Sequence, residues 1–339
     1  MSSSLEHPSE APRAAFQVQV AGTDLRFGVA PGERILAAGR RAGVWLPFEC
    51  GWGSCGTCKV TLVDGEVDSL YPDAPAIDAR DERRRRILAC QCTPKSDITV
   101  KVLKTGQLPE RPTVDHTAEV VDIEDLGNEI RRFRFRLGAD AQFRPGQYAI
   151  FDLGTGLRRC YSMATLPGTD VVEFIAKRYS ARPGSGALFS LAPGDRVAVE
   201  LPYGDMWFRA NDRDVVLTAG GTGLSPIMAL LRHFCDLGLN NRVWVFYGAN
   251  SEAELVCWPE MQALIGRLSA AELHGAVARP GDQWTGTRGL VTDALKTRLP
   301  DLPDAEHYLA GPPVMVDAVL DLLSANDVPK DRIHYDRFG

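Results

Sequence analysis

Three cysteines lie close together in the stretch CGWGSCGTC, at residues 50–58. Cys50, Cys55 and Cys58 follow the spacing C-x4-C-x2-C, and Cys90 lies well downstream in ILACQC. Two irons bridged by two sulfides need four thiolates, and this is the plant-type spacing that supplies them, with three thiols from one tight loop. The glycines between the thiols allow backbone N–H groups to turn toward the sulfurs and stabilise the added charge of a reduced [2Fe–2S] cluster.

A structural zinc site is the alternative use of such thiols. Zinc sites commonly pair their cysteines as C-x2-C twice, whereas Cys50 and Cys55 are separated by four residues. The spacing therefore favours the iron–sulfur cluster, with Cys92 as a second candidate for the fourth ligand. The cysteines outside the motif lie in apolar contexts that predict small buried side chains: Cys92, Cys160, Cys235 and Cys257.

A run of charged residues, DERRRR at 81–86, comes just before Cys90. Such a run is typical of a solvated turn. The alternative interpretation is a basic rim near the cluster that docks an acidic partner.

A second stretch with possible chemistry is RRCYSMA at 158–164. In a strand, Arg159 and Tyr161 point to one face and Cys160 to the other. A cation and an aromatic ring on one face of a barrel can hold a pyrophosphate and stack on a flat ring. In RPGSGALF at 182–189, Ser185 is predicted at a helix N-cap, where free N–H groups bind phosphate.

Two glycine turns follow in the last third of the chain. AGGTGLSP at 219–226 follows an apolar strand and opens a helix, so its glycines allow the backbone to approach a phosphate closely. It is not the G-x-G-x-x-G fingerprint of an ordinary Rossmann domain. YLAGPPVM at 308–315 is a similar turn, and both are expected at the carboxyl edge of one sheet, where α/β proteins bind ligands.

The elements that position these residues form three regions. Residues up to about 105 show short alternating strands and one helix, which predict a small mixed domain. From about 115 to 210 the signals are nearly all strand, with IRRFRFRL and VVEFIAK as examples, and they predict an antiparallel barrel. From about 213 strands and helices alternate, with RVWVFYG as a strand and EAELVCWPEMQALI as a helix, which predicts a parallel sheet with helices on both faces. Turn-forming residues around 104–115 predict a linker between the first and second regions.

Bulk composition excludes several classes of protein. The net charge of −6 argues against a general nucleic-acid binder, and the acidic surplus lies at residues 211–339, with 11 Lys and Arg against 17 Asp and Glu. The N-terminal stretch MSSSLEHPSEAPR lacks the features of a signal peptide, and the sequence contains no long apolar run. These features predict a cytoplasmic protein without a membrane span, where structural disulfides are rare.

Taken in order, these stretches resemble the ferredoxin-NADP reductase superfamily, in its branch with an N-terminal plant-type ferredoxin domain. The chain is most similar to the reductase components of toluene monooxygenase and carbazole dioxygenase systems. The resemblance covers roughly residues 14–339, and it rests on the ordered motifs CGWGSCGTC, YPDAPAIDARD, LACQC, RPGQY, RCYSMA, GGTGLSP, VFYGA, YLAGPPVMVDA and IHYDRFG.

The resemblance implies three domains: a β-grasp [2Fe–2S] domain at 14–105, an antiparallel FAD-binding barrel at 113–210 and an α/β NAD(P)H-binding domain at 211–339. It implies that the cluster ligands are Cys50, Cys55, Cys58 and Cys90. It places FAD and its pyrophosphate at Arg159, Tyr161, Ser162 and Ser185, and the nicotinamide nucleotide at Gly220, Gly221, Thr222, Gly223, Gly311 and Pro312. It assigns catalytic positions beside the flavin to Ser162, Asp336 and Phe338.

By this resemblance, NADH delivers a hydride to FAD, and single electrons then pass through the cluster to an oxygenase or to its Rieske or plant-type ferredoxin. The chain is expected to act as a monomer that binds this partner transiently. Glu252, after the second strand of the last domain, is expected near the 2′-hydroxyl of NADH because no Lys or Arg lies at residues 249–254. Two alternatives stay open: a reductase for sugar-nucleotide deoxygenation, and a redox-sensing interaction module.

Overall fold

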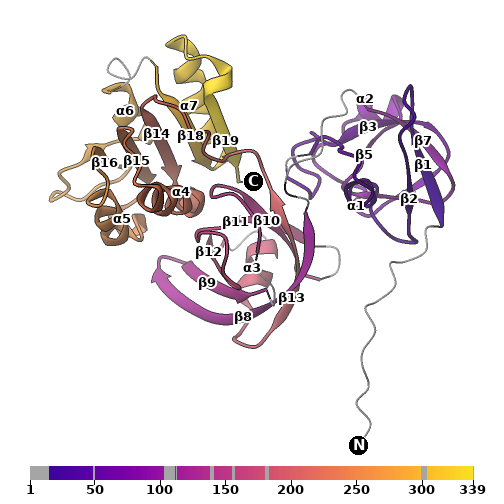
Figure 1. The fold of residues 1–339 in the computed structure, drawn as a ribbon, viewed down its shortest axis with the longest axis horizontal. Helices are drawn as coiled ribbons and strands as arrows, with labels where there is room; N and C mark the ends of the chain where they lie inside the picture. Colours follow the sequence, from indigo (N-terminus) through magenta and orange to yellow (C-terminus); the bar gives the residue numbers. More distant parts are fainter. Residues whose placement is uncertain are drawn as a thin grey trace, which may run out of the picture. The chain divides into compact units, whose positions relative to one another are not determined.

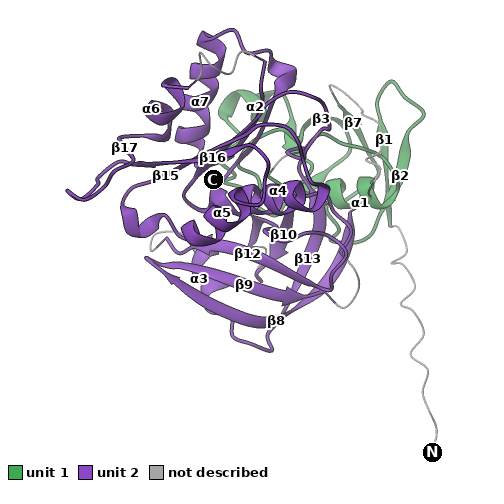
Figure 2. Ribbon diagram, turned by 60° about the vertical axis from the view of Figure 1, so that its left-hand side comes forward, with its two compact units in different colours: residues 1–112 green, residues 113–339 purple. Residues whose placement is uncertain are grey.

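The computed structural model describes residues 15–48, 50–102, 111, 113–137, 141–154, 157–179, 183–298 and 304–338. Contacts divide the chain into two compact units, residues 1–112 and 113–339, which Figure 2 shows in green and purple. The predicted linker at 104–115 lies largely outside the described residues. Within the described residues, no helix is long and apolar enough to cross a membrane.

The first unit is a five-stranded sheet in the order β2-β1-β7-β3-β5, with a two-stranded ribbon of β4 and β6 beside it. Strands β1 and β7 are parallel and the other pairs are antiparallel, which is the mixed sheet of a β-grasp domain. One face of this sheet packs on apolar residues of helix α1, including Ile35 and Leu36. The elements are β1 (Phe16–Val20), β2 (Arg26–Val29), α1 (Ile35–Arg41), β3 (Lys59–Asp64), β4 (Val67–Ser69), α2 (Ala79–Arg83), β5 (Arg86–Leu88), β6 (Cys92–Pro94) and β7 (Ile98–Lys101).

The second unit begins with a six-stranded antiparallel sheet in the order β11-β10-β13-β8-β9-β12. A bridge between Met163 and Phe174 joins the two outermost strands, so the sheet closes on itself and the predicted barrel is confirmed (Figure 1). Phenylalanines fill its interior, with Phe135, Phe151 and Phe174 in edge-to-face contact. The elements are β8 (Val114–Gly127), β9 (Ile130–Arg136), β10 (Tyr148–Asp152), β11 (Arg158–Ser162), β12 (Val171–Lys177), α3 (Pro183–Phe189) and β13 (Arg196–Tyr203).

The last part of the chain forms a parallel sheet in the order β17-β16-β15-β14-β18-β19. Successive residues of the buried strand β14 point to opposite faces: Leu217 packs with helices α4 and α5, and Val216 packs with α6 and α7. Helices on both faces are therefore confirmed. The elements are β14 (Val215–Gly220), η1 (Gly221–Gly223), α4 (Leu224–Leu237), β15 (Val243–Ala249), η2 (Glu252–Glu254), α5 (Trp258–Ile265), β16 (Ala271–Val277), β17 (Thr287–Arg288), α6 (Val291–Lys296), β18 (Glu306–Gly311), α7 (Pro313–Ala325), η4 (Lys330–Arg332) and β19 (Ile333–Arg337).

The predicted length of one helix beside this sheet is wrong. EAELVCWPEMQALI is not continuous: a 3-10 turn at Glu252–Glu254 precedes α5, which begins only at Trp258. Cys257 adopts a left-handed conformation with a φ of 59°, and Pro259 follows in the first turn of α5. A left-handed residue interrupts the helical hydrogen-bond ladder, so the segment forms two pieces.

A buried histidine makes the last domain sensitive to acid. His307 in β18 is fully buried, and neither of its ring nitrogens has a hydrogen-bond partner among the described residues. Burial lowers the pKa of His307 from about 6.5 to about 4. Between pH 6.5 and pH 4, His307 is protonated in the unfolded chain but not in the folded chain. Uptake of this proton favours unfolding, so the free energy of unfolding decreases as the pH falls from 6.5 toward 4.

We expect His307→Leu to remove this part of the acid sensitivity, which corresponds to about 1.4 kcal/mol for each pH unit. Thermal unfolding between pH 7 and pH 5, followed by circular dichroism, measures it. The melting temperature of the wild type is expected to fall more steeply than that of the variant. Parallel pH profiles would show that His307 is protonated in the folded chain.

Candidate functional site

The cysteine loop lies between α1 and β3, and its backbone turns toward the thiols. The N–H groups of Ser54 and Cys55 point at Cys50 Sγ, at 3.3 and 3.4 Å, and those of Cys50 and Thr57 point at Cys55 Sγ, both at 3.4 Å. The three glycines of the loop have positive φ values of 67°, 99° and 75°, which favour glycine and produce these turns. The loop thus offers a set of N–H donors suited to negatively charged sulfur.

The four thiols form two pairs. Cys58 Sγ lies 3.2 Å from Cys90 Sγ, and the Cys50 and Cys55 side chains are hydrogen-bonded to each other. No three of the His, Cys, Asp and Glu side chains that the structure describes converge as a single metal ion requires. Two pairs of thiols match two irons with two protein ligands each. This donor set fits a [2Fe–2S] cluster better than a mononuclear zinc site, which needs four ligands around one ion.

Backbone hydrogen bonds bring the distant Cys90 to the loop. Ala89 donates its N–H to the carbonyl of Cys58 at 3.1 Å and accepts from Leu36 of α1 at 2.8 Å. Cys92 lies in β6, where its Cα partner is Ser69 of β4. Burial raises the pKa of the Cys92 thiol to about 11, and the side chain is hydrogen-bonded to Ser69. Cys92 is therefore engaged away from the two pairs.

The charge run before Cys90 is only partly a solvated turn. Asp78 caps the short helix α2 by accepting from the N–H groups of Arg80 and Asp81. Asp81 is buried and binds Lys59 at 2.6 Å and Arg86 at 3.0 Å. The Lys59 ammonium holds the pKa of Asp81 well below its usual value, at about 2. The prediction of a simple solvated turn missed this buried carboxylate, which fixes α2 against β3.

The predicted flavin residues lie on β11 as expected for a strand. Arg159 is in direct contact with the first turn of α3, because a Cβ on Gly184 would lie 2.3 Å from Arg159 Nε. Tyr161 packs edge-to-face on Phe151, with ring centroids 5.4 Å apart. Ser162 is buried, and its Oγ has no hydrogen-bond partner among the described residues. A buried hydroxyl of this kind is suited to a ligand that completes its hydrogen bonding.

Ser185 is not at the helix N-cap that the sequence predicted. Helix α3 begins at Pro183, so Ser185 is its third residue. Its hydroxyl accepts from the N–H of Tyr179 at 2.9 Å and donates to the Tyr179 carbonyl at 3.2 Å. The proline, with its fixed φ, starts the helix earlier. Ser185 therefore lies in the first turn of α3, next to Gly184, which contacts Arg159.

The two glycine turns meet at the carboxyl edge of the parallel sheet, as predicted. Strands β14 and β18 are neighbours, with Ala219 opposite Ala310. A Cβ on Gly223 would lie 2.0 Å from the carbonyl oxygen of Ala310, and one on Gly220 would lie 2.3 Å from Met315 Sδ. Only glycine allows this close approach. The resulting edge presents Gly220, Gly221, Thr222 and Gly223 beside Gly311 and Pro312.

The C-terminal strand brings two further predicted residues to this edge. Asp336 in β19 is buried and lies opposite Ala310, and the N–H of Phe338 donates to the Gly311 carbonyl at 2.9 Å. A Cβ on Gly204 would lie 2.8 Å from the Tyr148 ring and 3.6 Å from Asp336 Oδ1.

Tyr148 links this edge to the flavin strand. It is the cross-strand partner of Ser162, and its ring stacks on Tyr203 with centroids 5.8 Å apart. The chain Ser162–Tyr148–Gly204–Asp336 therefore connects the predicted flavin residues of the barrel to those of the parallel sheet. Sequence reasoning gave no role to Tyr148 or Gly204, although Tyr148 closes the RPGQY motif.

Glu252 follows β15 and is exposed. Its Oε1 accepts from the N–H of Gly281 at 2.8 Å, so the carboxylate is held in the loop after the strand. Two cations that could bind a 2′-phosphate, Arg279 and Arg288, follow β16, the strand next to β15. The Arg288 guanidinium donates to carbonyls of residues 281, 282 and 284. Arg279 is exposed, and its backbone N–H donates to the Asn250 carbonyl.

Comparison with protein families finds three matching models. Residues 18–95 match the 2Fe-2S iron-sulfur cluster binding domain, 117–208 the oxidoreductase FAD-binding domain and 217–321 the oxidoreductase NAD-binding domain. The chain therefore carries domains for all three cofactors, and the architecture predicted from the sequence is confirmed.

Known proteins align over nearly the whole chain. The ferredoxin–NAD(+) reductase component of an alkene monooxygenase system from Xanthobacter autotrophicus is 37% identical, covering 92% of this chain and 97% of that protein. The reductase component of propane 2-monooxygenase from Rhodococcus jostii is 32% identical, covering 93% and 89%. Among solved structures, a ferredoxin reductase in carbazole 1,9a-dioxygenase has a TM-score of 0.86 at 32% identity, covering 96% of this chain and 98% of that one.

The pairing of thiols leads to a test of the fourth ligand. We expect Cys90→Ser to lose most of the iron and all reduction of cytochrome c by NADH, because one iron is left with a single protein thiolate. FAD content and NADH-dependent reduction of ferricyanide are expected to persist, because they depend on the second unit. Iron analysis, the visible spectrum and both assays measure this.

Cys92→Ser is the matched control, two residues away, and is expected to keep the cluster. An unaltered cluster spectrum in Cys90→Ser, or its loss in Cys92→Ser, would contradict the assignment.

Proposed function

Because the chain belongs to the family of ferredoxin–NAD(P) reductases that form the reductase components of multicomponent oxygenases, we propose that it oxidises NADH and delivers the electrons to an oxygenase or to its ferredoxin. When bound, FAD accepts a hydride and releases single electrons, and the [2Fe–2S] cluster carries them onward. The observation that carries the proposal is the meeting of the glycine edge, Asp336 and the flavin strand in one compact unit.

The residues of the chain bind and orient FAD and NADH and neutralise phosphate charge. Arg159, with the first turn of α3, offers a guanidinium and backbone donors to a pyrophosphate. Tyr161 offers an aromatic face, and the buried Ser162 hydroxyl offers a donor that is otherwise unused among the described residues. We assign the nicotinamide to the glycine edge at Gly220 and Gly311.

Asp336 and Phe338 complete the proposed site from the C-terminus. The register of β19 on β18 and the bond from Phe338 to Gly311 hold both residues at the edge. A ring at this position can cover a flavin and exclude water, and a buried carboxylate can hold a proton or orient a donor. We propose these roles together with the domain limits 14–105, 113–210 and 211–339, of which the limits 14, 105 and 339 lie outside the described part.

The partner is proposed to be an oxygenase component or a Rieske or plant-type ferredoxin. The relatives named above serve alkene and propane monooxygenase systems and a carbazole dioxygenase. Their agreement supports an oxygenase system over sugar-nucleotide deoxygenation or redox sensing. We further propose a monomeric, cytoplasmic protein that meets its partner transiently, since electron-transfer encounters bury little surface.

NADH is proposed as the preferred donor because the loop that follows β15 carries carboxylates. Glu252 is fixed by Gly281, and Glu254 binds Lys177 at 3.0 Å, so both acidic side chains have defined positions. A 2′-phosphate placed beside them would meet like charge. This repulsion disfavours NADPH relative to NADH.

We therefore expect kcat/KM for NADH to exceed that for NADPH by at least tenfold in steady-state assays with ferricyanide. Glu252→Gln is expected to reduce the preference, and Arg279→Gln to leave it unchanged. Equal kcat/KM values in the wild type, with NADPH activity lost in Arg279→Gln, would mean that Arg279 binds the 2′-phosphate.

The second unit is expected to accept a hydride from NADH without the first unit, because it contains every residue proposed to bind FAD and NADH. A chain that starts at Thr113 is expected to be yellow and to be reduced by NADH, yet to reduce cytochrome c very slowly. Flavin absorbance and both assays measure this. A folded fragment that binds no FAD would contradict the domain limits.

A further inference from the structure

Strand β12 is the outermost strand of the barrel, and alternate residues of it contact the nicotinamide domain. Glu173 binds Arg232 of α4 at 2.9 Å, the backbone of Ile175 binds Ser225 of α4, and Lys177 binds Glu254 of η2 at 3.0 Å. Alternate residues of a strand share a face. One face of β12 is therefore joined to the parallel-sheet domain along three successive positions.

The Ser225 contact completes the hydrogen bonding of this outermost strand. Ser225 Oγ accepts from the N–H of Ile175 at 3.2 Å and donates to its carbonyl at 3.1 Å. Ser225 is almost fully buried and follows Gly223 by two residues. The start of α4, and with it the glycine turn, is thus held in register with β12.

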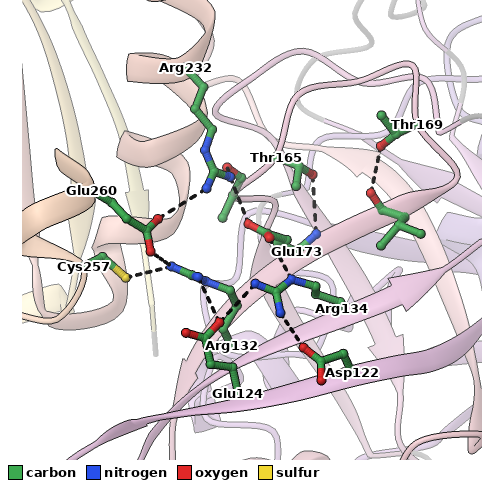
Figure 3. A network of polar contacts seen from close by, with 12 residues as sticks. Asp122, Glu124, Arg132, Arg134, Thr165, Thr169, Glu173, Arg232, Cys257 and Glu260 are labelled. Carbon is green, nitrogen blue, oxygen red and sulfur yellow. Dashed lines mark hydrogen bonds and ion pairs between the residues drawn. The ribbon is translucent and has the colours of Figure 1, made fainter. Parts of the chain in front are cut away.

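Arg232 reaches further, to the flavin strand. Seven residues after Ser225 on α4, it lies on the same side of the helix. Its Nη1 donates to the carbonyl of Ala164 at 2.7 Å and to Glu173 at 2.9 Å, and its Nη2 lies 3.5 Å from Glu260 of α5. Ala164 comes two residues after Ser162 and is itself tied to Glu173 by a backbone hydrogen bond of 2.8 Å. Figure 3 shows Arg232 above Glu173, with Arg134 on the opposite side of that carboxylate.

A second arginine extends the joint on the barrel side. Arg132 of β9 is buried and binds Glu124 of β8 together with Cys257 and Glu260 near the start of α5 (Figure 3). Glu260 therefore binds one arginine from each domain. Glu173 does the same, since it binds Arg134 of the barrel at 2.9 Å as well as Arg232. Shared carboxylates of this kind link the two domains into one network.

The contact between Glu173 and Arg232 is partly shielded from solvent. The side chains of Glu173 and Arg232 are 14% and 25% exposed, whereas Arg196, in a surface pair with Glu119 on the same barrel, is 70% exposed. Partly buried ion pairs with several hydrogen bonds are screened less than surface pairs and are geometrically defined. The joint can thus fix a distance, which a surface pair does poorly.

We propose that Arg232 is a positioning residue for hydride transfer: it holds the helix behind the nicotinamide-binding turn against the strand that carries the flavin-binding residues. The inference rests on the proposed function. Arg232 is not among the residues proposed to bind FAD or NADH. It acts through α4 on Gly220–Gly223 and through Ala164 on Ser162, and so sets how the two halves of the site face each other.

The test is anaerobic stopped-flow reduction of the flavin by NADH, followed at 450 nm, on the full chain with FAD and cluster bound. For Arg232→Gln we expect the limiting rate at saturating NADH to fall roughly tenfold to a hundredfold, because a displacement of about 1 Å can cost that much. The half-saturating NADH concentration is expected to change little, since the glycine edge is intact. Arg232→Lys, which keeps the charge, is expected to recover part of the rate.

A second readout does not depend on turnover. Binding of NAD+ to the oxidised protein is expected to perturb the flavin absorption spectrum less in Arg232→Gln than in the wild type, at a similar dissociation constant. A merely structural role would lower the melting temperature or FAD content and leave this spectrum unchanged. Arg196→Gln removes a barrel arginine whose guanidinium, among the described residues, pairs with Glu119. It is the matched control and is expected to behave as the wild type.

An Arg232→Gln protein with the wild-type limiting rate and NAD+ spectrum would overturn the inference. If that variant does not fold, Ser225→Ala is measured instead, with the same expected loss of limiting rate and the same overturning result. Failure of the proposed function would give a different result, because the wild type itself would then not be reduced by NADH.

Discussion

Close approach of backbone N–H groups to negative charge is the constraint on which the whole arrangement depends. A reduced cluster, a pyrophosphate and a nicotinamide nucleotide are all anionic, and each requires donors that a Cβ would push away. The cysteine loop meets this need with three glycines of positive φ. At the start of α3 and at the sheet edge, Gly184, Gly220 and Gly223 likewise lie where a Cβ would clash, against Arg159, Met315 and Ala310. The surrounding strands and helices hold these short turns in place.

Residue spacing carried most of this information in the sequence. The C-x4-C-x2-C spacing, strand alternation around Arg159 and the two glycine turns all depend on contacts within a few residues, and the fold confirmed the architecture predicted from them. Features that depend on distant contacts were missed. Strand β16 reads AELHGAV, whose mixed polarity gives no clear strand signal, and it forms because β15 lies beside it. The start of α3 at Pro183 was misplaced by three residues for a local reason, the preference of proline for the first helical turn.

Arg232 and Ser225 illustrate why a role can be invisible in sequence. Both lie in a stretch, LSPIMALLRHFCDL, that signals only an amphipathic helix following a glycine turn. Their significance comes from β12, fifty or more residues earlier in the chain. The stretch IRRFRFRL is a second example. Strand alternation predicts that Arg132 and Arg134 face solvent, yet Arg132 is buried against the other domain.

The joint between barrel and parallel sheet combines an apolar cluster, which includes Ile130 and Ile175 of the barrel, with charged and hydrogen-bonded contacts, and this combination has a consequence. Apolar surfaces adhere without direction, so two domains joined by them alone can slide by an ångström at little cost. An arginine fork that binds a carbonyl and two carboxylates has one good geometry. Hydride transfer is steeply sensitive to distance, so a directional joint suits it better than a merely adhesive one. The same reasoning explains why Glu173 and Glu260 each bind arginines from both domains. A change of register breaks several hydrogen bonds at once, so α4 and β12 are held in the one arrangement that satisfies them all.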